Sequence, residues 1–173
     1  MSAEDLRAKI REIPDFPKPG ILFYDITTLL KDAAAYREAI DLMLAPYREL
    51  GVELVVGMES RGFIFSGPIA YQLNAGLIPV RKLGKLPAET ISVEYALEYG
   101  SATVAIHVDA LKPGSRVLLI DDLLATGGTA AAAAALVKRL GAQILEISFL
   151  IELGFLGGRQ KLKDYRVRSL VMY

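Results

Sequence analysis

The chain has no cysteine and only one histidine among its 173 residues. Without cysteine it can form no disulfide bond, no thiolate metal site and no cysteine nucleophile. The single histidine, His107, stands in a strand-like run, where we expect a packed or exposed structural role and not catalysis.

Net charge and long apolar runs are also missing. The 20 lysines and arginines are matched by 20 aspartates and glutamates, which argues against a general binder of polyanions such as nucleic acids. The apolar runs are far too short to span a membrane. The N-terminal stretch MSAEDLRAKIREI is charged and amphipathic, unlike a signal peptide. We therefore expect a soluble cytoplasmic protein with no nucleic-acid and no membrane partner.

Hydrophobic residues make up 53% of the chain, enough for a sizeable core in one domain over residues 1–173. Short apolar strands alternate with helical segments, which indicates an α/β fold with parallel βαβ units. The expected strands are 54–57, 77–80, 91–95, 102–108, 117–120, 143–153 and 166–172. We expect a short helix after Ser2 and a helix over about 33–49 with Asp32 as its N-cap. Two further helices are expected over 63–74 and about 129–140. Prolines 14, 17 and 19 indicate an ordered loop or arm near the N-terminus.

One stretch carries clear chemistry: RVLLIDDLLATGGTAA, residues 116–131. A buried strand ends in Asp121 and Asp122, and a small, flexible segment then leads into a helix. Ligands of open α/β sheets bind beyond the carboxyl ends of the strands. Because neighbouring residues of a strand point to opposite faces, both acids can serve one site only if the chain turns immediately after residue 120.

The flexible segment is suited to an anion. Its backbone amides, with the start of the following helix, can surround a phosphate monoester, and Thr126 and Thr129 add hydroxyl donors. The two carboxylates need hydroxyls or a cation instead, so the inferred ligand is a sugar phosphate, with Mg²⁺ able to bridge further oxygens. The patterns G-x-x-x-x-G-K-[ST] and G-x-G-x-x-G are both absent.

The stretch VLLIDDLLATGGT resembles the signature of the type I phosphoribosyltransferases, which bind 5-phosphoribosyl 1-diphosphate (PRPP). DFPKPGILFYDIT, GMESRGFIFSGPIA, RKLGKLPAET, EYALEYGSATVAIHVDAL and LGGRQKL narrow this resemblance to the adenine phosphoribosyltransferases, over about residues 13–163. The resemblance implies a central, mostly parallel sheet flanked by helices, a small N-terminal hood within residues 1–30, and a mobile β-hairpin loop over 82–101. It also implies transfer of phosphoribose from PRPP to adenine, giving AMP and diphosphate, with Mg²⁺ bound mainly through PRPP.

The resemblance assigns roles to individual residues. Asp121 and Asp122 would bind the ribose hydroxyls. The residues that would hold the 5′-phosphate are Ala125, Thr126, Gly127, Gly128 and Thr129. Cations for the diphosphate would be Arg61, Arg81, Lys82 and Lys85, with Arg61 and Arg81 also counted as catalytic.

The remaining roles concern the base. Glu98 would exchange a proton at adenine, and Tyr99 would help to close the loop and exclude water. Phe23 and Leu123 would stack on the two faces of adenine, and the backbone of Leu22 would read its amine edge. The sequence departs from some relatives at Tyr24 and Ser66.

Two alternatives stay open: a phosphoribosyltransferase for xanthine, guanine or hypoxanthine, and a non-catalytic regulator that senses PRPP. The family resemblance also predicts a homodimer.

Overall fold

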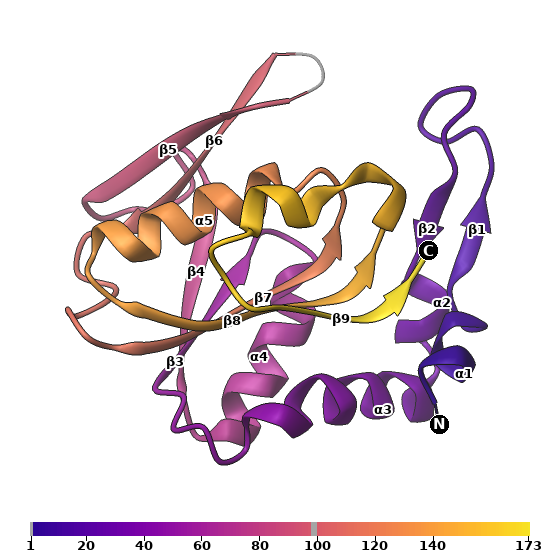
Figure 1. Cartoon of the computed structure of the whole chain (residues 1–173), viewed down its shortest axis with the longest axis horizontal. Helices are drawn as coiled ribbons and strands as arrows, with labels where there is room; N and C mark the ends of the chain where they lie inside the picture. Colours follow the sequence, from indigo (N-terminus) through magenta and orange to yellow (C-terminus); the bar gives the residue numbers. More distant parts are fainter. Residues whose placement is uncertain (1, 98–99) are drawn as a thin grey trace. The chain divides into compact units, whose positions relative to one another are not determined.

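The computed structural model describes residues 2–97 and 100–173. By its internal contacts the chain divides into two compact units, Met1–Leu42 and Met43–Tyr173, and Figure 1 labels the elements of both. Helix α3 (Ala33–Leu44) begins in the first unit and ends in the second.

The first unit holds two short helices and a small sheet. Its elements are α1 (Ala3–Arg7), β1 (Arg11–Ile13), β2 (Phe23–Asp25) and α2 (Thr27–Leu30). The predicted capping of α1 is confirmed, because the Ser2 hydroxyl accepts a hydrogen bond from the Asp5 amide at 3.2 Å. The predicted start of α3 is also confirmed, since Asp32 Oδ1 accepts from the amides of Ala34 and Ala35 at 3.1 Å each.

The N-terminal arm is more regular than predicted. Strands β1 and β2 pair in antiparallel register, with Arg11 opposite Asp25 and Ile13 opposite Phe23. The carboxylate of Asp25 accepts hydrogen bonds from Arg11 and from Thr27, and these side-chain contacts support the sheet. The two strands lack the alternation of apolar and polar residues from which a strand can be predicted. The prolines lie in the connection between the two strands, where no ladder hydrogen bond is lost.

The second unit is built on a seven-stranded sheet in the order β5-β6-β4-β3-β7-β8-β9. Its strands are β3 (Leu54–Met58), β4 (Gly76–Lys82), β5 (Thr90–Ala96), β6 (Ser101–His107), β7 (Arg116–Leu124), β8 (Gln143–Glu152) and β9 (Val167–Met172). Strands β4, β3, β7, β8 and β9 run parallel, and β5 and β6 form an antiparallel hairpin. The predicted α/β fold with a mostly parallel sheet is therefore confirmed.

Two helices pack on opposite faces of this sheet (Figure 1). Helix α4 (Gly62–Leu73) lies against β3, β4 and β7, and α5 (Gly128–Arg139) lies against β5, β6, β7 and β8. Three short 3₁₀ helices complete the unit: η1 (Ala45–Tyr47), η2 (Gly154–Leu156) and η3 (Gly158–Leu162). Ser66 of α4 is fully buried, and a Cβ on Gly57 of β3 would lie 2.2 Å from its hydroxyl oxygen. Only glycine therefore fits beneath that helix.

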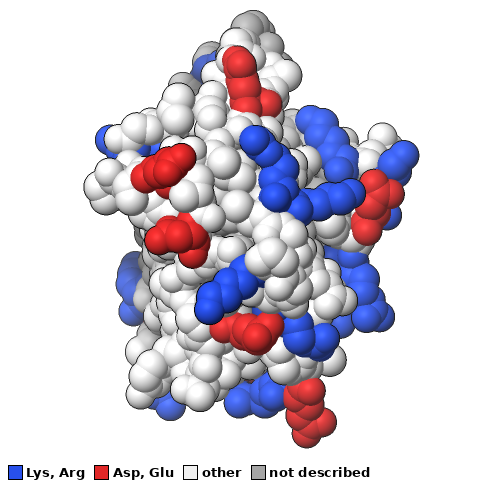
Figure 2. Space-filling view, turned by 90° about the vertical axis from the view of Figure 1, so that its left-hand side faces the viewer, with Lys and Arg blue, Asp and Glu red and all other residues white. Residues whose placement is uncertain are grey.

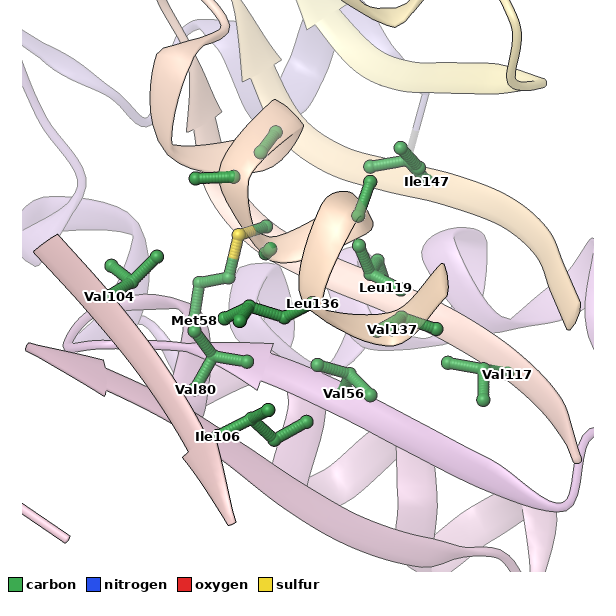
Figure 3. Close-up of a cluster of buried hydrophobic side chains, with 14 of the residues drawn as sticks. Val56, Met58, Val80, Val104, Ile106, Val117, Leu119, Leu136, Val137 and Ile147 are labelled. Atoms are coloured by element: carbon green, nitrogen blue, oxygen red, sulfur yellow. The ribbon is translucent and has the colours of Figure 1, made fainter. Parts of the chain in front are cut away.

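The core between α5 and the sheet explains the run of six alanines. Side chains of β3, β4, β6, β7 and β8 converge with Leu136 and Val137 of α5 (Figure 3). Ala130, Ala132 and Ala133 are buried in the same cluster, where their small side chains let the helix approach the sheet closely. The predicted close packing of this helix is confirmed.

Two predicted boundaries are wrong. Helix α3 ends at Leu44 and not near residue 49, because Pro46 cannot continue an α-helix and the chain passes into η1. Strand β7 does not end at Ile120 but continues through both aspartates to Leu124. Pairing with β8 maintains it, since Asp121 lies opposite Phe149 and Leu124 opposite Glu152.

On the face drawn in Figure 2, basic and acidic side chains lie next to one another, in keeping with the zero net charge of the chain. No helix among residues 2–97 and 100–173 is long and apolar enough to cross a membrane.

Candidate active site

A pocket of about 390 Å³ opens at the carboxyl end of the central strands of the second unit. It combines acidic, basic and hydroxyl side chains from the ends of β3, β4 and β7 and from the start of α5. Its lining residues are Glu59, Ser60, Arg61, Lys82, Asp121, Asp122, Leu123, Ala125 and Thr129. This is the edge of an open α/β sheet at which ligands bind.

The two aspartates reach this pocket without the immediate turn that the sequence suggested. The strand continues past them, yet both carboxylates line the pocket, because they stand where β7 extends beyond β3, whose pairing with β7 ends at Ile120. The expectation of a turn directly after residue 120 is therefore wrong, although the two acids do line one pocket.

Asp121 and Asp122 are both buried, with 8% and 6% of their surfaces exposed. Oδ1 of Asp121 accepts a hydrogen bond from the Asp122 amide at 2.8 Å. Burial, and then the neighbouring charge of Asp122, raise the pKa of Asp121 well above its ordinary value. A Cβ on Gly62 would lie 2.8 Å from the same oxygen, so the start of α4 fits against Asp121 only because residue 62 is glycine.

Asp122 has a cationic partner. Its Oδ2 lies 2.7 Å from Nε of Arg61, whose side chain is 41% exposed while that of Asp122 is 8% exposed. The arginine thus compensates a buried carboxylate and still presents part of its guanidinium to the pocket. Arg61 stands at the N-cap of α4, directly after the loop that follows β3.

Glu59 lines the pocket, although the sequence analysis assigned it no role of its own. Its Oε2 accepts hydrogen bonds from Arg81 Nε at 3.3 Å and from the Lys82 amide at 2.9 Å. Burial raises the pKa of Glu59, but these hydrogen bonds and the charge of Arg81 outweigh it, so the net pKa is lowered. The peptide bond between Glu59 and Ser60 is cis.

The four predicted cations are not equally placed. Arg61 and Lys82 line the pocket. Arg81 contacts it through Glu59 and donates a further hydrogen bond to the carbonyl of Lys85 at 3.3 Å. Lys85 lies on the exposed loop after β4, and its side chain does not line the pocket.

The segment Ala125–Thr129 curves around a second, smaller hollow of about 80 Å³. Gly127 has a φ of +81° and forms the N-cap of α5, so the cap has no side chain and the first amides of the helix are open to a ligand. Gly127 also packs on η3, because a Cβ there would lie 2.4 Å from the Gly158 carbonyl oxygen. A negative group in this hollow would be stabilised by the amides and by the helix dipole.

The predicted base-binding residues fall in different places. Leu123 lines the main pocket. Phe23 is half-buried in the first unit, where its ring meets that of Phe16 edge to face with centroids 5.1 Å apart, and the neighbouring Leu22 is exposed. Glu98 and Tyr99 lie outside the described residues, so their predicted roles stay predictions.

Residues 25–171 match the phosphoribosyl transferase domain family. The chain belongs to this family.

Several named proteins similar to the chain are adenine phosphoribosyltransferases. An adenine phosphoribosyltransferase of Desulfitobacterium hafniense is 56% identical over 173 residues, which cover 100% of both chains. The crystal structure of the adenine phosphoribosyltransferase from Thermoanaerobacter pseudethanolicus matches with a TM-score of 0.96 and 50% identity, covering 99% of this chain and 100% of that one.

A third relative is a phosphoribosyl transferase with ligands. The adenine phosphoribosyltransferase from Saccharomyces cerevisiae, solved with adenine and an imino-altritol bisphosphate, has a TM-score of 0.92 and 40% identity, with 98% of each chain covered. These likenesses extend over both units of the chain.

Proposed function

We propose that this phosphoribosyl transferase moves the 5-phosphoribosyl group of PRPP to adenine, giving AMP and diphosphate in purine salvage. The observation that carries the proposal is one pocket in which two adjacent buried aspartates meet the open start of α5. This arrangement supports recognition of hydroxyls and of a phosphate by neighbouring residues, as a sugar phosphate requires.

The phosphoribosyl half of the ligand is assigned to β7 and α5. The amides from Ala125 to Thr129 and the two threonine hydroxyls would donate to the 5′-phosphate. Asp121 and Asp122 would accept from the ribose hydroxyls. Two adjacent carboxylates are costly to ionise together in a buried place, and hydroxyl donors from the ligand would offset that cost.

The leaving diphosphate is assigned to the cations around the loop after β3. Charge accumulates on it as the bond to the ribosyl carbon breaks, and Arg61 and Lys82 lie where they can stabilise that charge. Arg81 would act beside them, held by Glu59. Lys85 would contribute only through movement of its exposed loop.

The bond to the base forms as the diphosphate leaves. Adenine N9 attacks the ribosyl carbon through its lone pair while the bond to diphosphate breaks, and Glu98 would accept the proton released from the other ring nitrogen. Tyr99 would exclude water, while Phe23 and Leu123 would hold the ring and Leu22 would read its amine edge. Each of these assignments rests on the family resemblance.

Mg²⁺ is the proposed cofactor. Within residues 2–97 and 100–173 no three His, Asp or Glu side chains are grouped to hold a metal ion. Of the three carboxylates that line the pocket, Glu59 and Asp122 pair with arginines. We therefore assign Asp121 as the carboxylate that would contact an ion held mainly by PRPP oxygens. When bound, Mg²⁺ would neutralise part of the charge on the diphosphate. Removal of Mg²⁺ by chelation should abolish AMP formation, and added Mg²⁺ should restore it.

The deciding experiment offers PRPP with adenine, hypoxanthine, guanine and xanthine in turn and follows nucleotide formation. We expect AMP from adenine at a kcat/KM far above that for the three other bases. Preference for a 6-oxopurine would overturn the choice of base. PRPP binding without any nucleotide product would instead point to a regulator that senses PRPP.

We further propose, from the family resemblance, a homodimer in solution. Light scattering after size-exclusion chromatography should give about twice the 18.8 kDa mass of one chain. A single-chain mass at micromolar concentration would contradict it. A cytoplasmic location stays a prediction.

A further inference from the structure

Tyr95 contacts the segment Ala125–Thr129, to which the 5′-phosphate is assigned, from outside the main pocket. It stands on β5, in the part of the sequence that the family resemblance describes as a mobile loop, and it is half-buried. The hydroxyl of Thr129 donates a hydrogen bond to the Tyr95 hydroxyl oxygen at 3.0 Å. Thr129 itself lines both hollows of the site, so this hydrogen bond ends at a residue that faces the ligand.

The ring of Tyr95 also packs on the backbone of the same segment. A Cβ on Gly128 would lie 3.0 Å from Cδ2 of the tyrosine, closer than almost any real contact. Residue 128 is thus glycine where an aromatic ring covers the backbone. Ring and hydroxyl together hold two successive residues at the start of α5.

The strand that carries Tyr95 is fixed to α5 at a second point. Arg139, in the last turn of α5, donates a hydrogen bond to the Ser92 carbonyl at 2.9 Å. Tyr95 contacts the first turn of the same helix. Strand β5 therefore lies along α5 with a contact at each end, so the tyrosine is not a freely moving side chain.

We propose that Tyr95 is a positioning residue for the 5′-phosphate, acting through Thr129; this rests on the proposed function. Phosphate oxygens only accept hydrogen bonds, so Thr129 must turn its single proton towards the ligand. Its oxygen then becomes an acceptor, and Tyr95 is the donor in place to fill that role. A chain of hydrogen bonds from Tyr95 through Thr129 to the phosphate strengthens each member.

The hydrogen bond also connects the proposed phosphate site to the β5–β6 hairpin, whose segment of chain carries Glu98. Tyr95 lies three positions before Glu98 on the same segment of chain. A bound phosphate that reverses the Thr129–Tyr95 hydrogen bond holds β5 against α5.

The test is a double-mutant cycle of Tyr95→Phe, Thr129→Val and the double variant, with AMP and adenosine as probes in calorimetric titrations. Tyr95→Phe keeps the ring and removes only the hydroxyl. We expect it to weaken AMP binding about 3- to 10-fold, the usual effect of one hydrogen bond, and to leave adenosine binding unchanged because adenosine has no phosphate. In the Thr129→Val background the same substitution should have almost no effect.

Kinetics provide the second readout. Tyr95→Phe should raise KM for PRPP more than it changes KM for adenine or kcat. Tyr165→Phe, another half-buried tyrosine of the same unit, is the matched control and should change none of these constants.

Equal losses for AMP and adenosine, or additive effects of the two substitutions, would overturn the proposal for Tyr95 and leave the proposed function intact. If the unsubstituted chain formed no AMP from PRPP and adenine, the proposed function and this inference would both fall.

Discussion

At the scale of single residues, the two adjacent aspartates are not equivalent. Asp122 is paired with Arg61 at 2.7 Å, whereas Asp121 accepts a hydrogen bond from the Asp122 amide and has its pKa raised by burial and by Asp122. Asp122 is therefore an ion-paired acceptor, and Asp121 is a carboxyl that resists ionisation. Substituting each in turn should separate the two roles.

Asp122→Asn should weaken use of PRPP by about 10- to 100-fold in KM, because a charged acceptor for ribose hydroxyls is lost and Arg61 is released. KM for adenine should change much less. Steady-state kinetics with each substrate varied in turn will measure this. Asp109→Asn, at an exposed aspartate beyond β6, is the control, and an equal effect of both variants would contradict the assignment.

Asp121→Asn should stabilise the ligand-free protein at high pH while it weakens PRPP use. Because folding raises the pKa of Asp121, the unfolded chain loses that proton first. The free energy of unfolding then falls as pH rises from the ordinary Asp pKa of about 3.9 through the folded value. The variant lacks this loss, so its melting temperature relative to the unsubstituted chain should rise by a few degrees between pH 4 and pH 8. A constant difference across that range would refute the argument.

At the scale of elements, the segment Ala125–Thr129, to which the 5′-phosphate is assigned, packs on the short helices after β8. Gly158 at the start of η3 meets this segment so closely that an added Cβ would lie 2.4 Å from the Ala125 carbonyl oxygen. Gly158→Ala must therefore displace the segment, and we expect AMP binding to weaken at least tenfold. Gly67→Ala in α4 is the matched control, since its Cβ would meet nothing within 4 Å. Titration calorimetry with AMP distinguishes the two, and unchanged affinity in Gly158→Ala would show that the segment adapts.

The same short helices are anchored by a bidentate ion pair. Arg159 donates to both oxygens of Glu152 at 2.7 and 2.8 Å, and Ser169 donates to the same carboxylate. Burial raises the pKa of Glu152, but the hydrogen bonds from Arg159 and Ser169 outweigh it and the net pKa is lowered. Stability from this pair is therefore present above the ordinary Glu pKa of about 4.3 and is lost as pH falls through the folded value.

Arg159→Gln should accordingly lower the free energy of unfolding by about 1–3 kcal/mol at pH 7, since it leaves a buried carboxylate without its cation. The difference from the unsubstituted chain should shrink as pH falls below about 4. Urea unfolding at several pH values provides the measurement. Arg168→Gln, whose contact with Glu146 is 3.7 Å and more exposed, should cost less than about 1 kcal/mol.

At the scale of the whole molecule, the pattern of hydrophobic residues and the residues that begin or end helices predicted most elements of the second unit. Apolar runs marked the parallel strands, and Gly141 marked the end of α5 close to where it occurs. In the first unit, Asp32 marked the start of α3. The length of β7 was missed because two acids look like the end of a strand, whereas pairing with β8 continues past them. The β1–β2 hairpin was missed because its support comes from Arg11 and Asp25, far apart in the sequence.

The candidate site was only partly predictable for a similar reason. Motif residues of β7 and α5 are consecutive, so the sequence alone places them together. Glu59 and Tyr95 act through contacts with Arg81 and Thr129, more than twenty positions away in each case. An acid beside a loop and a tyrosine in a strand have no local signal that distinguishes them from ordinary surface or core residues.

The proposed assignment of Phe23 to the base can be tested apart from the assignments to PRPP. The family resemblance assigns Phe23 to adenine and assigns the phosphoribosyl group to residues of β7 and α5. Stacking of a base on an aromatic ring contributes about 1–3 kcal/mol, so Phe23→Ala should raise KM for adenine by about 5- to 100-fold. KM for PRPP should change less than about threefold, because none of its proposed ligands is altered. Phe155→Ala, at a ring of the second unit that is 72% exposed, should change neither constant. A parallel rise of both constants in Phe23→Ala would contradict a role of Phe23 in specific recognition of the base.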